Sequence, residues 1–149
     1  MSPRTGLVYA SIFNICMDLT DHTVPYIAGT PYDGMEMKRH PAPGGNWGEF
    51  MAWDPVAGKK VWSIKEQFMT MGGVLATAGD LVFNGEGNGY FRAFDAKNGK
   101  KLWEFQCGAG VNAPAVTYMV NGKQYIAVAA GGNTQLDFKR GNSVVVFGL

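Results

Sequence analysis

The chain has 149 residues, of which 46% are hydrophobic and 17% are charged, and its formal net charge is +1. This composition is typical of a packed globular protein and excludes a disordered chain. The nearly neutral charge predicts no basic face for nucleic acid, and no apolar run approaches the roughly 20 residues of a membrane helix. The 21 glycines and 7 prolines indicate many turns and little helix.

The first third of the chain is expected to hold one strand and a long loop. The opening letters MSPRTG are turn-forming and carry no secretory signal, so we expect this start to be a cut through a larger protein. Residues 7–13 are apolar enough for a buried strand. Residues 14–48 are interrupted by four prolines and predict an irregular loop, which in a compact domain is usually functional or an insertion.

Two similar segments follow, and they predict a structural repeat. AWDPVAGKKVW (52–62) and AFDAKNGKKLW (93–103) are offset by 41 residues and share six of eleven residues. Each reads as a hairpin between two short strands. A repeat of about 40 residues that encodes strands is typical of a β-propeller blade.

The shared residues have physical roles in a hairpin. Asp54, like its counterpart Asp95, can accept hydrogen bonds from the N–H groups of the turn, and the shared glycine can adopt φ > 0. Trp62 and Trp103 then fall on the following strand, where a large ring can wedge between neighbouring sheets.

The second hairpin lies within a segment that predicts one complete four-stranded unit. Short apolar runs at residues 74–76, 81–83 and 90–94 precede the strand that begins at Lys101, and turn-forming residues separate them. The turn Gly85–Gly89 (GEGNG) superficially resembles a phosphate-binding loop. No helical pattern follows it, which favours a glycine-rich hairpin turn.

The last part of the chain predicts three strands of another unit. Residues 115–120 and 124–129 are joined by Asn121-Gly122, a strong hairpin signal. Residues 134–142 form a polar loop, and residues 143–147 are β-branched and apolar.

These strands predict an all-β fold, a partial β-propeller with about three four-stranded antiparallel blades; that the complete ring has eight blades is what the family resemblance described below implies. Residues 1–66 form an incomplete blade with the loop insertion, residues 67–106 a complete blade, and residues 107–149 a last blade that lacks its outer strand. Three blades cannot close a ring, which normally has four to eight. The two open faces are therefore expected to need the missing blades or another chain as partner.

The chain resembles the C-terminal end of the quinoprotein alcohol dehydrogenases of the methanol and ethanol dehydrogenase family, which use pyrroloquinoline quinone (PQQ). The tail after Ala130 is similar to that of membrane glucose dehydrogenases. The segments that carry the resemblance are NICMD (14–18), YIAGTPY (26–32), the two tryptophan hairpins, GVLATAGDLVF (73–83), NGKQYIAV (121–128) and AGGN (130–133).

The resemblance implies a periplasmic oxidoreductase that oxidises an alcohol or a sugar, with hydride transfer to the quinone. It implies that the catalytic aspartate and the ligands of a calcium or lanthanide ion lie outside this chain, so that the isolated chain is inactive. Asp18, Asp21 and His22 match no standard metal-site spacing and favour a solvated loop over a metal site.

The resemblance also implies four cofactor-binding residues: Met71, Gly72, Gly132 and Asn133. Met71 replaces a family tryptophan and is expected to pack against the quinone edge, with core filling as the alternative. Gly132 is expected to admit the cofactor close to the backbone. Asn133 stands where the methanol branch has tryptophan and the glucose branch has histidine. It could hydrogen-bond a carboxylate or serve only as a turn residue.

Two further alternatives remain open at this point. Cys16 matches a family cysteine whose partner lies upstream, so a free buried thiol is favoured over a Cys16–Cys107 disulfide. The whole chain could also be a propeller-type scaffold or protein-interaction module without catalysis, which would have no need of a glycine-lined pocket. The substrate, the metal and the electron acceptor are not determined by these residues.

Overall fold

The computed structural model describes residues 1–148. All the regular secondary structure in these residues is β-strand. None of these residues forms a helix that could cross a membrane. The predicted all-β fold is therefore confirmed. The strands are β1 (Val8–Phe13), β2 (Ile15–Asp21), β3 (Met35–Pro41), β4 (Gly48–Asp54), β5 (Lys59–Glu66), β6 (Leu75–Ala76), β7 (Leu81–Gly85), β8 (Tyr90–Asp95), β9 (Lys101–Gln106), β10 (Val116–Val120), β11 (Lys123–Ala130) and β12 (Ser143–Gly148).

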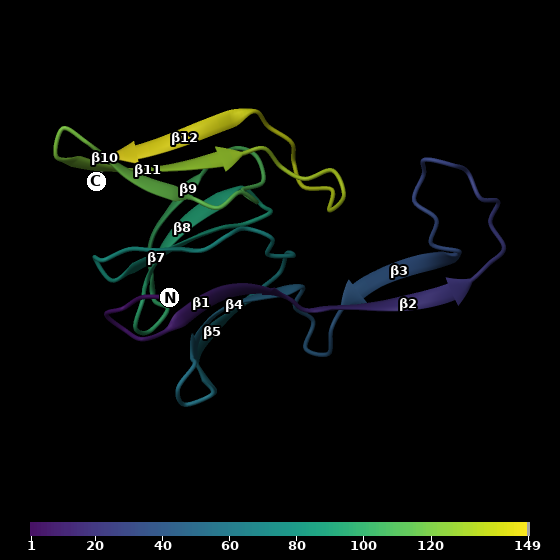
Figure 1. The fold of residues 1–149 in the computed structure, drawn as a ribbon, viewed down its shortest axis with the longest axis horizontal. Coiled ribbons are helices and arrows are strands. Elements are labelled where there is room, and N and C mark those ends of the chain that lie inside the picture. The colour runs from purple at the N-terminus through teal and green to yellow at the C-terminus, as the bar shows by residue number, and fades with distance from the viewer. Residues whose placement is uncertain (149) are drawn as a thin grey trace.

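Three antiparallel sheets follow one another along the chain. The first has the order β1-β4-β5, the middle one β6-β7-β8-β9, and the last one β10-β11-β12. Figure 1 shows these sheets stacked in chain order as an open array. Strands β2 and β3 form a separate two-stranded sheet that projects from this array.

The two repeated hairpins have the same local structure. The carboxylate of Asp54 accepts hydrogen bonds from the N–H groups of Val56 and Ala57, both at 2.9 Å, and Asp95 caps the other turn in the same way. Each strand pair has an irregularity in register two residues before its aspartate. The repeat therefore encodes one hairpin geometry twice, as the shared residues predict.

Trp62 joins the first sheet to the middle sheet. Its indole Nε1 donates a hydrogen bond of 3.1 Å to the carbonyl oxygen of Ala96 in the second hairpin turn. The ring covers Gly99, where an added Cβ would lie only 2.7 Å from a ring carbon, and Gly99 has a φ of +72°. Phe50 packs between Trp62 and Phe94, at 5.2 Å from each ring centroid. The predicted role of Trp62 as a wedge between sheets is thereby confirmed.

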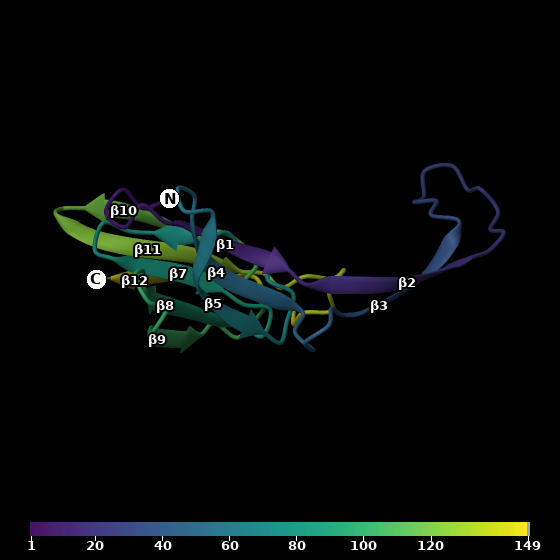
Figure 2. The ribbon, with the colours of Figure 1, turned by 90° about the horizontal axis from the view of Figure 1, so that it is seen from below.

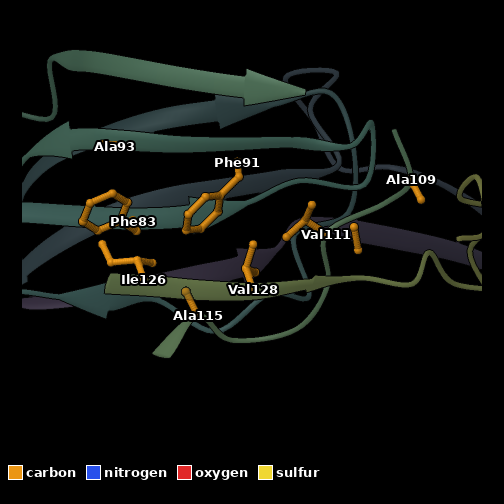
Figure 3. Close-up of a cluster of buried hydrophobic side chains, with 9 residues drawn as sticks. Phe83, Phe91, Ala93, Ala109, Val111, Ala115, Ile126 and Val128 are labelled. Carbon is orange, nitrogen blue, oxygen red and sulfur yellow. The ribbon is translucent and has the colours of Figure 1, made fainter. Parts of the chain in front are cut away.

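A second hydrophobic cluster joins the middle sheet to the last sheet. Phe83 and Phe91 from the middle sheet face Ile126 and Val128 of β11, and Val111 from the connecting segment closes one end (Figure 3). All five side chains are buried. Each pair of neighbouring sheets is thus held by its own apolar layer.

The prediction of an irregular loop over residues 14–48 is wrong for two segments, 15–21 and 35–41, whereas residues 22–34 and 42–47 are free of strand as predicted. These two segments pair as β2 and β3 and form an arm, whose tip is the strand-free segment 22–34 (Figures 1 and 2). Pro25 and Pro31 fall in this tip and Pro41 ends β3, so none of these three prolines interrupts the pairing. The many charged side chains of β3 hid this strand from the sequence analysis, because its side chains alternate between two faces that are both exposed.

The two cysteines lie apart on different elements. Cys16 is on β2 in the arm, and Cys107 follows β9, and both are free thiols. The alternative of a disulfide between them is therefore wrong. Burial raises the pKa of the Cys107 thiol, which lowers its reactivity at neutral pH.

The buried carboxyl group of Glu66, at the end of β5, is expected to make the free energy of unfolding depend on pH. Only 7% of this residue is exposed, and burial raises the pKa of its carboxyl, an effect that the charge of Arg92 partly offsets. The folded state therefore holds the proton more tightly than the unfolded state. The stability that this group contributes is complete below the unfolded pKa and is lost as the pH rises through the folded pKa.

We expect Glu66→Gln to raise the free energy of unfolding at pH 7 and to leave it unchanged below about pH 4, where the unfolded carboxyl is also protonated. Urea unfolding at both pH values measures this difference. Glu49→Gln is the matched control, because Lys60 and Ser63 lower the pKa of Glu49. The control should lose stability at pH 7. Equal signs for the two variants would contradict the assignment.

Candidate active-site loops

The structure brings together the two chain segments that carry the four expected cofactor-binding residues. Met71 and Gly72 lie between β5 and β6, and Gly132 and Asn133 lie just after β11. The side-chain amide of Asn133 donates to the sulfur of Met71 at 3.5 Å, across 62 positions of sequence. Residues that are remote in the chain therefore meet at one end of the sheet array.

Asn133 has two roles at once. Its Oδ1 accepts hydrogen bonds from the N–H groups of Gln135 at 2.8 Å and Leu136 at 3.1 Å. The turn role considered as an alternative for Asn133 is therefore real. Within residues 1–148, the Nδ2 group hydrogen-bonds only to the weakly accepting sulfur of Met71, so this donor has capacity for a stronger acceptor.

Contacts within the chain itself favour glycine at Gly72 and require it at Gly132. At Gly72 an added Cβ would lie 3.1 Å from the carbonyl oxygen of Gly85. At Gly132 the φ is +72°, and an added Cβ would lie 2.2 Å from the carbonyl oxygen of Lys139. These contacts explain the glycines by packing, and the approach of a cofactor to Gly132 stays a prediction.

Backbone hydrogen bonds lock the neighbouring loops into one unit. The N–H of Gly132 donates to the carbonyl of Gly110 at 2.8 Å, and the N–H of Gly110 donates to Lys139 at 2.9 Å. The N–H of Val111 donates to Glu86 at 2.9 Å. These loops of the middle and last sheets thus form a common platform for the candidate residues, made of Glu86, Gly110, Val111, Gly132 and Lys139.

A polar hollow of about 400 Å³ opens on this platform. It is lined by Gly131, Gly132, Asn133, Thr134, Gln135 and Arg140. Its side chains offer amide, hydroxyl and guanidinium donors and contain no carboxylate. This set of donors suits a ligand with negative charge or several acceptor oxygens.

Buried polar residues beside the platform were not identified from the sequence. Glu86 is 2% exposed, bonds the guanidinium of Arg92, and accepts from the Asn88 side chain at 2.9 Å. Asn84 is fully buried, and its Nδ2 has no partner among the residues described. The available signal was a carboxylate inside the glycine-rich turn 85–89, which we interpreted as a turn alone.

Two other features help to define the site. An apolar groove of about 470 Å³ runs between the middle and last sheets and is bordered by Leu102, Trp103, Val146 and Phe147. Within residues 1–148, no three His, Cys, Asp or Glu side chains are grouped so that they could hold a metal ion. The polar hollow is lined by Gly132 and Asn133, and for this reason we take it as the candidate ligand site of the part of the chain that the structure describes.

Gly132→Ala tests the packing of the platform. We expect a loss of about 1–3 kcal/mol in the free energy of unfolding, because alanine is strained at this φ and would collide with Lys139. Thermal and urea unfolding measure the loss. Gly131→Ala is the matched control, since the nearest atom to its added Cβ is 4.0 Å away. Equal losses for the two variants would refute the packing explanation.

Comparisons with known proteins agree with this geometry. Residues 23–126 match the PQQ family described as the glucose/ethanol/alcohol dehydrogenase, beta-propeller domain. The lanthanide-dependent methanol dehydrogenase of Methylorubrum extorquens is 46% identical over 132 residues, and the quinoprotein ethanol dehydrogenase of Pseudomonas aeruginosa is 45% identical over 130 residues. Each match covers 87% of this chain.

The solved structures give the same result. A europium-containing methanol dehydrogenase superposes with a TM-score of 0.81 at 38% identity, over 88% of this chain and 23% of that chain. A quinohemoprotein alcohol dehydrogenase from Comamonas testosteroni has a TM-score of 0.78 at 32% identity. The chain spans only 22% of the length of the Methylorubrum relative and 21% of the Pseudomonas relative.

Proposed function

The chain belongs to the family of PQQ-dependent glucose, ethanol and alcohol dehydrogenases with a β-propeller domain, and we propose that it is the C-terminal sector of a periplasmic enzyme that oxidises an alcohol or a sugar. Its all-β array is a partial propeller, as the solved relatives indicate. The resemblance of its tail to membrane glucose dehydrogenases stays a prediction.

The three sheets support a division into blades at residues 1–66, 67–106 and 107–149. The middle sheet has four strands and the flanking sheets have three each. The outward face of the last sheet exposes apolar side chains on β10 and β12, among them Val116, Tyr118, Val144 and Val146. A sheet face of this kind requires cover, which we assign to the preceding blades of the complete enzyme or to another chain.

The polar hollow fits one edge of an anionic cofactor. Bound PQQ supplies the two-electron acceptor of the family, with a calcium or lanthanide ion polarising it. In this chain, Asn133 Nδ2 would donate to an acceptor oxygen of the cofactor, and Met71 would cover its edge. Thr134 and Arg140 add donors beside them. We assign the catalytic aspartate and the metal ligands to the part of the enzyme outside this chain.

The observation that carries this proposal is the contact between Met71 and Asn133 above the interlocked loops. Two segments that the family resemblance singled out separately occupy one place in the fold. A scaffold protein has no need of such a polar hollow. We therefore favour an enzyme sector over an interaction module, and we expect the isolated chain to be inactive.

A hybrid protein tests the proposal. The chain would replace the matching segment of the Methylorubrum methanol dehydrogenase. We expect the hybrid to bind PQQ, measured by absorbance of the purified protein, and to oxidise alcohol with a dye as acceptor. A folded hybrid that retains no PQQ would overturn the proposal. So would alcohol oxidation by the 149-residue chain alone with PQQ and calcium or a lanthanide.

The site residues are tested in the same hybrid. Asn133→Ala and Met71→Ala should each weaken PQQ binding about tenfold, which corresponds to the loss of one hydrogen bond or one packing contact. Met119→Ala is the matched control, because this methionine is exposed on β10. PQQ affinity unchanged by both site variants would remove these residues from the cofactor site.

A further inference from the structure

The chain contains four Asn-Gly pairs, all of them in the middle and last sheets. They are Asn84-Gly85, Asn88-Gly89, Asn98-Gly99 and Asn121-Gly122. Asn-Gly is the pair in which an asparagine amide is lost most easily, because glycine has no Cβ to hinder the approach of its backbone nitrogen. Each pair is therefore a chemical site whose reactivity depends on how the fold holds it.

The reaction is intramolecular and uses water as the only second reactant. The backbone nitrogen of the glycine loses its proton and attacks Cγ of the asparagine. The new C–N bond closes a five-membered succinimide, the Cγ–Nδ2 bond breaks, and ammonia leaves. Water then opens the ring at one of its two carbonyls and yields aspartate or isoaspartate. A hydrogen-bonded glycine N–H or a fixed asparagine side chain slows the attack.

The first pair is held inside the molecule. Asn84 is fully buried on β7, and its Oδ1 accepts a hydrogen bond from Ser11 Oγ at 3.1 Å. Gly85 is also buried and pairs with Phe91 of β8. Strand β7 would have to leave the sheet before the nitrogen of Gly85 could reach the Asn84 side chain.

The second pair lies in the turn between β7 and β8, where both reacting groups are engaged. The N–H of Gly89 donates to the carbonyl of Glu86 at 3.1 Å. The Asn88 side chain accepts from the N–H of Tyr90 at 3.1 Å and donates to the carboxylate of Glu86 at 2.9 Å. These bonds must break before the ring can close.

The third pair lies in the turn between β8 and β9 and is held in a similar way. The N–H of Gly99 donates to the carbonyl of Asp95 at 2.9 Å, and Asn98 Oδ1 accepts from the N–H of Lys100 at 2.8 Å. The ring of Trp62 also covers Gly99. This turn must likewise open before the attack.

The fourth pair has no such restraint. Asn121 and Gly122 make up the two-residue turn between β10 and β11 (Figure 1), and both are exposed. Within residues 1–148, neither the Asn121 side chain nor the N–H of Gly122 makes a hydrogen bond. Asn121 has a φ of 50°, which costs energy in a residue other than glycine. Strand β10 is exposed at the edge of its sheet, so opening this turn breaks few contacts.

We propose that Asn121 is a modification site, at which the chain deamidates through Gly122. Isoaspartate leads the backbone through Cβ and lengthens the turn, which disrupts the closing pair of Val120 with Lys123. Aspartate keeps the backbone and adds a negative charge. This inference is independent of the proposed function, because the reaction uses only the turn itself and water.

Peptide mapping by mass spectrometry tests the proposal on the 149-residue chain incubated at mildly alkaline pH. We expect deamidation at Asn121 to be at least about tenfold faster than at the other three pairs, whose turns or strand must open first. An equal or faster rate at any of the other three would overturn the proposal. So would an unmodified Asn121 in a chain whose unfolded form deamidates.

The same chain unfolded in urea is the matched control, because it keeps every Asn-Gly pair and removes the fold. The four rates should then lie within about threefold of one another, since an unfolded chain has little fixed structure. If Asn121 led by the same factor in urea, its preference would come from local sequence, and the structural assignment would fail.

Asp95→Ala tests the protection of the third pair. The carboxylate of Asp95 accepts from the N–H groups of Lys97 at 2.8 Å and Asn98 at 3.3 Å, so its removal loosens this turn. We expect the rate at Asn98 to rise about fivefold in the folded variant, with the rate at Asn121 unchanged. An unchanged rate at Asn98 would show that hydrogen bonds in the turn do not control deamidation, and would overturn the proposal.

Discussion

Replacing Trp62 by alanine is expected to lower the free energy of unfolding by about 2–4 kcal/mol. The indole fills the space between the first and middle sheets, packs on Phe50, and donates to the carbonyl of Ala96. The substitution leaves a cavity above Gly99 and removes one of the two side-chain hydrogen bonds to the carbonyl of Ala96, so that only the bond from the Tyr9 hydroxyl stays. Urea unfolding of the 149-residue chain, followed by circular dichroism, measures the loss.

Two variants separate the contributions of the ring and its position. Trp62→Phe keeps most of the ring and loses the N–H, so we expect a loss of about 1 kcal/mol from the hydrogen bond. Trp103 occupies the equivalent place in the repeat but is 38% exposed and packs on Phe147. Trp103→Ala should therefore cost less than Trp62→Ala in this chain. A larger cost at Trp103 would contradict the docking of Trp62 between sheets.

Phe91→Ala is expected to have the largest effect at the other junction, a loss of about 3–5 kcal/mol. Phe91 is buried, and its ring stacks at 5.6 Å on Phe83 and at 5.7 Å on Phe147 of β12. Removing this ring loosens the last sheet from the middle one. Hydrogen exchange should therefore accelerate in β11 and β12 more than in β4 and β5.

Phe105→Ala is the matched control for this prediction. Phe105 also contacts Phe147, with ring centroids 5.2 Å apart, but Phe105 is 44% exposed on β9. Its truncation should cost less than half as much as that of Phe91. If hydrogen exchange increased equally in all three sheets, the sheets would not be joined by separate apolar layers.

The part of the fold that could be predicted from sequence is the part fixed by local turn chemistry. Asp54, Asp95 and the glycine of each repeated turn determine the hairpins, because their hydrogen bonds and dihedral angles are satisfied within a few residues. Asn121 and Gly122 likewise adopt positive φ values of 50° and 77° in the predicted turn. The tryptophan wedge followed from the spacing of the repeat.

The arm could not be predicted in the same way. Its strands are exposed on both faces, so burial did not impose the apolar alternation that marks a strand in a sheet that packs on a core. The letters MEMKRHP in β3 contain alternating methionines, but charge and proline obscured them. Only the pairing of β2 with β3 across the tip reveals the two faces.

The cofactor-binding role of the candidate residues stays a prediction, and the contacts that hold these residues in place could not be predicted from sequence. The resemblance to a known family selected Met71 and Asn133, whereas their mutual contact depends on the paths of the segment between β5 and β6 and of the segment after β11. The glycines beside them serve the packing of loops that are remote in sequence. The ion pair of Glu86 with Arg92 was missed, and so was the Nδ2 of Asn84, which has no hydrogen-bond partner within residues 1–148. Burial of single polar residues leaves no periodic signal.

Hydrogen exchange of β12 tests most directly whether the chain is one sector of a larger propeller. The amides of β12 would be compared in the isolated chain and in the hybrid with the Methylorubrum methanol dehydrogenase. The expected result is that amides on the outer edge of β12 exchange at least about tenfold more slowly in the hybrid, where a fourth strand pairs with them. Identical exchange rates in the two proteins would show that no additional strand pairs with β12. This result would contradict the proposal that the chain is one sector of a larger propeller.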